Sequence, residues 1–215
     1  MKYGTLSADI VQSTSLTVDD TKRLHQYLDR FLSEMQELYP NRLWGRLVKG
    51  DEIELVTDSP NDVFRIALML KCYVKAFVPN DEVGRDFKKF GVRIALGVGS
   101  LRINDDVTGV MDGEAIYFSG RGLSRLAGAK SNLSFAMSDA GLSDAVNTIC
   151  VLVSDLLDGA TQKQCQVLYW KLRGKNETEI ENILGVSQPT VNKMSASASW
   201  HSLGKALGYY ENINF

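Results

Sequence analysis

Ala8-Asp9-Ile10-Val11-Gln12-Ser13-Thr14-Ser15-Leu16 is the stretch that decides the fold, together with Lys49-Gly50-Asp51-Glu52-Ile53. Each stretch places an aspartate where an apolar run meets a polar turn, and an amphipathic segment long enough for a helix separates them. If the two strands lie side by side, Asp9 and Asp51 converge on one edge of a sheet. Two converging carboxylates can hold a hard divalent cation such as Mg²⁺, which commonly binds together with substrate phosphates. The two stretches therefore predict a nucleotide-handling domain.

The hydrophobic periodicity around these stretches predicts alternating strands and helices over residues 3–140. The order is strand, helix, two strands, helix, strand, and then a further helix and strand. This order is typical of an α+β, ferredoxin-like sheet with helices packed on one face. The strands are expected at 3–11, 43–49, 52–57, 92–98 and 133–137, and the helices at 17–39, 60–78 and 116–126.

The pattern changes near residue 140, where an apolar stripe without strand signal begins. We interpret residues 141–158 as a connecting helix, which either packs on the first domain or forms a dimer seam. The chain then divides into a domain at 1–140, this connecting helix, and a small helical domain at 159–215. The stripe consists of Leu142, Val146, Ile149, Val153, Leu156 and Leu157.

Composition is that of an ordinary soluble globular protein, since 44% of the 215 residues are hydrophobic and 23% are charged. The formal net charge of -2 gives no global reason to expect a nucleic-acid or membrane partner. No apolar run is long enough to span a bilayer, and no signal-peptide pattern is present. Three scattered cysteines (Cys72, Cys150 and Cys165) argue against a disulfide framework. We therefore expect a cytoplasmic protein without membrane contact.

Three closely spaced helical segments follow Thr161, and the turn Gly185-Val186-Ser187 joins the last two. A short turn with glycine between two short helices is the helix-turn-helix pattern. The sequence from Leu184 to Val191 resembles the helix-turn-helix of LuxR-type regulators and of sigma-factor region four. The resemblance covers most of residues 159–204.

This resemblance implies that the segment starting at Ser187 enters the major groove of DNA. The residues implied to contact DNA are Ser187, Gln188, Thr190, Asn192 and Lys193. Gln and Asn can pair bidentately with adenine, and Lys can reach guanine or phosphate. Residues 158–215 hold only six Lys and Arg against five Asp and Glu, so a single copy should bind weakly and a homodimer is expected. Alternatively, the unit mediates only protein contacts.

The two opening stretches also resemble the metal motifs of class III nucleotidyl cyclases, and similar segments occur in bacterial SatD-type proteins. The resemblance continues in order through the strand Val92–Gly99, the helix Gly113–Leu126 and the strand Leu133–Ser138. It covers roughly residues 3–140 and implies a cyclase-like fold.

Carried over, the resemblance makes Asp9, Asp51 and the Ile10 carbonyl ligands of Mg²⁺ or Mn²⁺. It makes Arg121 the group that stabilises charge on a transferred phosphoryl group, as a planar guanidinium can. Backbone N–H groups at a helix start would hold phosphates. These groups belong to Gln12, Ser13, Thr14 and Ser15.

Three positions depart from the cyclase pattern. Tyr117 stands where the family has an asparagine, Leu47 lies near the position of the base-reading lysine, and Val110 lies near that of its acidic partner. Leu and Val cannot bond to a purine edge. Strand alternation would turn Glu52 away from the face of Asp51, and Arg93 is expected to be solvated or ion-paired. Either a sensor kept the phosphate end of the site, or a phosphoryl-transfer enzyme has a different base pocket.

The leading interpretation is a cytoplasmic DNA-binding transcriptional regulator, in which the cyclase-like domain senses a metal-bound nucleotide or phosphorylated ligand. The alternative is a divergent nucleotidyl cyclase or other metal-dependent phosphoryl-transfer enzyme. A third possibility is an interaction protein with a degenerate metal site. The three departures favour a protein that is not an enzyme.

Overall fold

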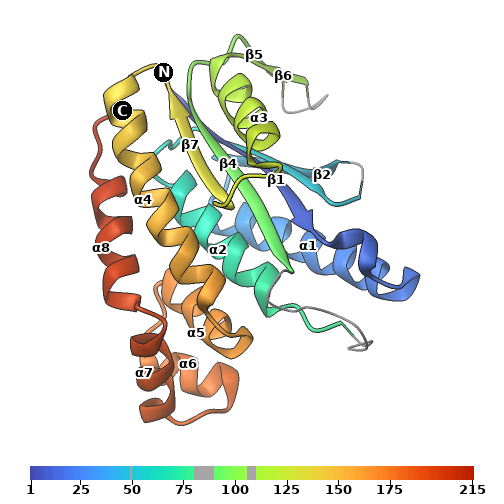
Figure 1. The fold of residues 1–215 in the computed structure, drawn as a ribbon, viewed down its shortest axis with the longest axis vertical. Coiled ribbons are helices and arrows are strands. Elements are labelled where there is room, and N and C mark those ends of the chain that lie inside the picture. The colour runs from blue at the N-terminus through green and yellow to red at the C-terminus, as the bar shows by residue number, and fades with distance from the viewer. Residues whose placement is uncertain (49, 80–89, 106–109) are drawn as a thin grey trace.

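The computed structural model describes the chain except for residues 49, 80–89 and 106–109, and it describes no side chains in 103–110. Its centre is a five-stranded sheet in the order β2-β3-β1-β4-β7, in which only the β4–β7 pair is parallel. A separate hairpin, β5 (Ile103–Asp105) and β6 (Val110–Asp112), projects from it (Figure 1). The strands of the sheet are β1 (Tyr3–Val11), β2 (Leu43–Val48), β3 (Glu52–Thr57), β4 (Gly91–Gly99) and β7 (Leu133–Met137).

Helices cover both faces of this sheet, and the α+β fold class expected from the sequence is confirmed. On one face, α1 (Val18–Leu38), α2 (Val63–Ala76) and α4 (Ala140–Gly159) share the main core with the strands. We expected helices on one face only, but α3 (Glu114–Leu126) packs against β1, β4 and β7 from the other side.

The close approach of α3 to the sheet has a local cause. The Thr5 hydroxyl on β1 donates to the Ala115 carbonyl at 2.7 Å. A Cβ on Gly97 of β4 would lie 2.2 Å from that same oxygen. Only glycine at residue 97 lets the first turn of α3 rest on the strand.

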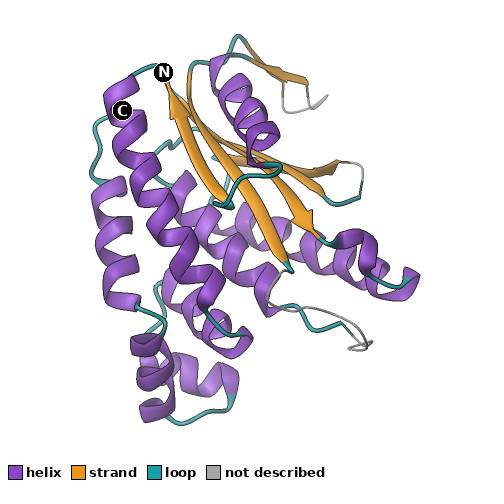
Figure 2. Ribbon diagram, viewed as in Figure 1, coloured by secondary structure: helices purple, strands orange, loops and turns teal. Residues whose placement is uncertain are grey.

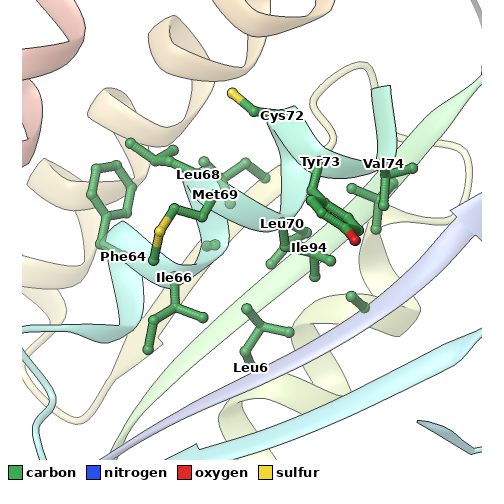
Figure 3. Packing of buried hydrophobic residues seen from close by; sticks show 14 of the residues in the cluster. Leu6, Phe64, Ile66, Leu68, Met69, Leu70, Cys72, Tyr73, Val74 and Ile94 are labelled. Carbon is green, nitrogen blue, oxygen red and sulfur yellow. The ribbon is translucent and has the colours of Figure 1, made fainter. Parts of the chain in front are cut away.

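The core lies between α2 and the sheet, where Ile66 and Leu70 meet Leu6 and Ile94 (Figure 3). α2 is buried on nearly all sides because the C-terminal helices cover its back, and even Lys71 is only 3% exposed. Figure 2 shows how much of the molecule beyond the sheet is helical. These helices are α5 (Gln162–Leu172), α6 (Glu177–Leu184), α7 (Gln188–Ser197) and α8 (Trp200–Glu211).

The last helix is a correction to our sequence interpretation, which assigned residues 200–203 to the packing surface of the preceding helix. α7 ends at Ser197, and Ser199 has a φ of 57°, which breaks the helical path. α8 then returns to the sheet domain, where Tyr210 stacks on Phe64 with ring centroids 4.8 Å apart. The Tyr210 hydroxyl donates to the Pro60 carbonyl at 3.2 Å.

α4 covers the open edge of β7. Asn147 accepts from the Phe135 backbone N–H at 2.9 Å and donates to the Phe135 carbonyl at 2.5 Å. The Ser154 hydroxyl accepts from the Asn132 N–H at 3.2 Å. By length and hydropathy α4 would pass as a membrane span, contrary to our expectation from the sequence, although this is weak evidence. In the structure its polar side chains bond to the sheet domain, so it packs as part of that domain.

Candidate functional site

Asp9 lies on β1 directly between two charged cross-strand neighbours. The register pairs it with Glu52 on β3 and with Arg93 on β4. Directly opposed residues project from the same face of a sheet, so the three side chains share a face. This is also the face on which Thr5 contacts α3. From the alternation of side chains along one strand, we compared the position of Glu52 only with that of Asp51. The register between β1 and β3, which places Glu52 beside Asp9, was therefore missed.

The Asp9 carboxylate forms an ion pair with the Arg93 guanidinium. The two side chains are 24% and 27% exposed, so the pair is partly shielded from water. The expectation that Arg93 is solvated or ion-paired is confirmed. Its Nε atom is buried and makes no hydrogen bond in the part of the chain that is described.

Asp51 lies in the turn between β2 and β3, close to the end of β1. Its carboxylate accepts a hydrogen bond from the Ser13 hydroxyl at 2.6 Å, and its carbonyl accepts from the Ile10 N–H at 3.3 Å. Gly50 has a φ of 88°, and a Cβ there would lie 3.2 Å from the His25 ring of α1. The turn, the loop after β1 and the start of α1 therefore meet at one end of the sheet.

The expected phosphate-binding segment forms a single 3-10 turn, Ser13–Ser15, rather than the start of an α-helix. Gln12 precedes it with a left-handed φ of 65°. The Ser15 N–H donates to the Gln12 carbonyl at 3.1 Å, and the Ser15 hydroxyl donates to the same oxygen at 2.8 Å. Ser15 is therefore already bonded within the turn, whereas a phosphate role for Gln12, Ser13 and Thr14 stays a prediction.

The two aspartates reach the same region, but their carboxylates take separate partners. Asp9 is neutralised by Arg93, and Asp51 is held by Ser13. Among the described residues, no cluster of three or more His, Cys, Asp and Glu side chains could hold a metal ion. A fixed guanidinium beside Asp9 also repels a dication. This arrangement does not fit a divalent cation shared by Asp9, Asp51 and the Ile10 carbonyl.

The structure does not bring Arg121 to Asp9 within one chain. Ala115 and Ser119 of α3 are buried against the sheet, whereas Tyr117 and Arg121 are exposed. The Arg121 guanidinium lies over the Tyr117 ring, 5.6 Å from its centroid. Both line a hollow of about 450 Å³ at the start of α3.

Leu47, one of the two base-reading positions, does not contribute to the face of Asp9 either. Leu47 pairs with Ile53, and both pack in the core on the face covered by α1, α2 and α4. On the Asp9 face, the neighbouring Arg46 bonds to Glu54 at 2.8 Å. The side chain of Val110 lies outside the described residues.

The helices α5, α6 and α7 meet around a small core of Val167, Ile180 and Val191. Gly185, with a φ of 65°, ends α6, and the chain enters α7 after two more residues. The short turn with glycine that the sequence predicts between these two helices is present. Of the residues predicted to contact DNA, Ser187, Gln188, Asn192 and Lys193 are exposed, and Thr190 is half-buried.

A carboxylate that the sequence did not suggest adjoins α7. Glu177 of α6 accepts a hydrogen bond from Asn192 at 3.1 Å and pairs with Lys171 at 3.2 Å. The hydrogen bond from Asn192, followed by that from Lys171, lowers the pKa of Glu177 below its ordinary value. Glu177 therefore stays ionised and adds negative charge to the surface of α7.

Comparison with known proteins adds a partial likeness of fold. No protein-family model matches the chain, and no curated protein is significantly similar to it. Two similar solved structures are both of a bacterial light-regulated adenylyl cyclase. One is 13% identical to this chain with a TM-score of 0.42, and the match covers 62% of this chain and 74% of the cyclase chain. The other is 16% identical to this chain with a TM-score of 0.44, and the match covers 63% of this chain and 43% of the cyclase chain. At this level of similarity the comparison concerns the fold alone and assigns no role to any residue of a site.

Proposed function

We propose that this chain is a DNA-binding transcriptional regulator that reads DNA through α7. The observation that carries the proposal is the unit α5–α7, in which a tight turn holds α7 on a dedicated small core with polar residues outward. Gln188 and Asn192 are one helical turn apart, so their side chains share one face of α7. Both can pair bidentately with adenine.

The weak positive charge of this unit supports a homodimer. Lys193 is the exposed cation on α7. Its charge is offset by that of Glu177, which accepts a hydrogen bond from Asn192 of the same helix. Phosphate contacts supply most non-specific affinity, so two copies are needed for stable binding. Half-sites read by such a dimer would lie about 34 Å apart, one turn of DNA.

The sheet domain would sense a phosphorylated ligand such as a nucleotide. Arg93 would bind its phosphate by exchanging Asp9 for it, and the polar loop after β1, where Ser13 now donates to Asp51, lies at the same end of the sheet. Mg²⁺ or Mn²⁺ would accompany this ligand only if Arg93 released Asp9.

Fluorescence anisotropy with labelled genomic fragments tests DNA binding. We expect Asn192→Ala to weaken binding at least tenfold, as loss of a bidentate base contact does. Asn182→Ala, an exposed asparagine on α6, is the matched control. The proposal is wrong if the wild-type chain binds no fragment at low salt, or if both variants behave alike.

A second candidate is a divergent nucleotidyl cyclase or other phosphoryl-transfer enzyme. It is favoured by the Ser13–Asp51 contact, which joins the loop after β1 to the second aspartate. Incubation with each nucleoside triphosphate and Mn²⁺, followed by mass spectrometry, distinguishes the two functions. Turnover that Asp51→Asn abolishes would establish the enzyme, whereas unchanged nucleotides together with DNA binding would support the regulator.

A further inference from the structure

A second ligand site is suggested by two adjoining hollows where α1 and α2 meet α5, on the opposite side of the core from β7. Their volumes are about 230 and 440 Å³. They share four lining residues, Tyr27, Arg30, Ala76 and Gln166, and together we call them the aromatic groove. The groove lies between α1 and α2 of the sheet domain and α5, the first helix of the DNA-reading unit.

Four aromatic rings line the smaller hollow. Tyr27 stacks on Tyr73 with centroids 3.9 Å apart, Tyr73 contacts Tyr169 at 5.2 Å, and Tyr169 meets Trp170 edge-on at 5.2 Å. The Tyr27 hydroxyl donates to the Tyr73 carbonyl, and the Tyr169 hydroxyl donates to Glu34. Burial raises the pKa of Tyr73 to about 12, so its ring stays neutral. Rings held in this way form a rigid wall on which another flat ring can stack.

Among the described residues, the rim of the groove carries more positive than negative charge. The Glu34 carboxylate forms an ion pair with Arg173 at 2.6 Å and a longer contact with Arg30 at 3.9 Å. Arg23 pairs with Asp20 at 2.8 Å. Three guanidinium groups thus face two carboxylates. The Arg30 side chain, which is 76% exposed, lines both hollows.

We propose that the aromatic groove binds a flat aromatic ligand that carries an anionic group, either a carboxylate or a phosphate. The ring occupies the smaller hollow against Tyr27 and Trp170, and the anionic group lies at the rim against Arg30. Ring stacking and a charge-assisted hydrogen bond are the two interactions that these side chains offer. The Gln166 amide can bond to a polar edge of the ring.

Occupation of the groove would act on the DNA-reading unit, because α5 contributes Gln166, Tyr169 and Trp170 to its wall. The ligand would clamp α5 against α1 and α2. The binding site itself does not depend on whether α7 reads DNA.

Calorimetry and tryptophan fluorescence test this proposal on the full chain. The probes are AMP, indole-3-acetate, adenosine and inorganic phosphate. AMP carries an aromatic ring and a phosphate, and indole-3-acetate carries an aromatic ring and a carboxylate. Adenosine lacks the anionic group, and inorganic phosphate lacks the ring. We expect at least one of the first two to bind, and Trp170→Phe to remove the change in fluorescence. Adenosine and phosphate should bind at least tenfold more weakly than the aromatic anion.

Arg30→Gln is the decisive variant, because the Arg30 side chain is 76% exposed and its contact with Glu34 is long at 3.9 Å, so the change should cost little stability. It should weaken the aromatic anion about tenfold and leave adenosine unchanged. Arg125→Gln, an exposed arginine on α3, is the matched control and should bind like the wild type. Absence of heat with all four probes, equal binding of phosphate alone, or unchanged affinity in Arg30→Gln would each overturn the proposal. DNA binding measured separately keeps this outcome distinct from failure of the proposed function.

Discussion

Asp9 on β1 and Arg93 on β4 face each other across the two central strands and form an ion pair. In the cyclase-like interpretation of the sequence, the charge beside Asp9 would belong to a metal ion. Here the protein supplies that charge from its own chain. Affinity for a metal and the position of one arginine should therefore be linked.

Arg93→Gln should raise the affinity for Mn²⁺ at least tenfold, because it frees the Asp9 carboxylate and removes a repelling charge. Calorimetric titration with Mn²⁺ measures this. Arg125→Gln serves as a charge-matched control, and adding Asp9→Asn to Arg93→Gln should abolish the gain. Equal Mn²⁺ affinity in the wild type and Arg93→Gln would contradict the link.

Lys71 on α2, whose side chain is only 3% exposed, forms an ion pair at 2.8 Å with Asp158 at the end of α4, whose side chain is 36% exposed. Asp158→Ala should cost about 3 kcal/mol, because it leaves the Lys71 ammonium buried without its counter-charge. Lys71→Met should cost much less, since a flexible apolar chain fills the same space and Asp158 keeps bonds from Asn132 and Ser154. Urea unfolding of both variants measures the difference. Equal losses would show that the pair does not act through the buried ammonium.

The same pair predicts a pH dependence of stability. Burial alone would raise the pKa of Asp158, but the Lys71 charge and the hydrogen bonds outweigh it, so the pKa lies below its ordinary value. A depressed carboxyl pKa stabilises the fold above the unfolded value, which is about 3.9, and this stability is lost as pH falls below it. Thermal unfolding between neutral pH and pH ~3 should therefore show a smaller decline in Asp158→Asn than in the wild type. A parallel decline in both would exclude Asp158 as the titrating group.

Asn147→Ala should destabilise the chain by about 1–3 kcal/mol, the cost of leaving buried polar groups unbonded. The variant removes both partners of the Phe135 backbone on β7. Hydrogen exchange at the Phe135 amide should accelerate with it. Thr148→Ala, which removes only a bond within α4, is the control and should leave that exchange rate unchanged.

Glu177→Gln should strengthen binding of the chain to non-specific DNA several-fold at low salt. It removes one negative charge beside α7 and keeps an acceptor for Asn192. Asp144→Asn on α4 changes the same net charge at an exposed site on another helix. If both variants bind alike, the local position of Glu177 has no influence on DNA.

Local patterns predicted the sheet and its main helices well. The apolar spacing of α1, the proline boundaries of α2 and the run Gly91–Gly99 each depend on neighbours along the chain. The fusion of a cyclase-like sheet to a helix-turn-helix stays a prediction, but the elements it requires are present.

Features that depend on register or on distant packing could not be predicted in this way. Nothing near Asp9 in the sequence indicates that Arg93, 84 residues later, stands opposite it. Likewise, Leu47 and Arg46 exchange faces with a shift of one residue, so the position of a base-reading residue depends on the exact turn. The aromatic groove brings together residues of α1, α2, α5 and α6 and has no linear signal.

The return of α8 to the sheet domain has a consequence for biosynthesis. Tyr210 closes the core against Phe64 and Pro60, and it emerges from the ribosome about 150 residues after them. At 5–20 residues per second, roughly 8–30 s pass between the synthesis of α2 and that of α8. The nascent chain therefore exposes part of α2 until α5 and then α8 are made, so this protein should depend on chaperones that bind growing chains.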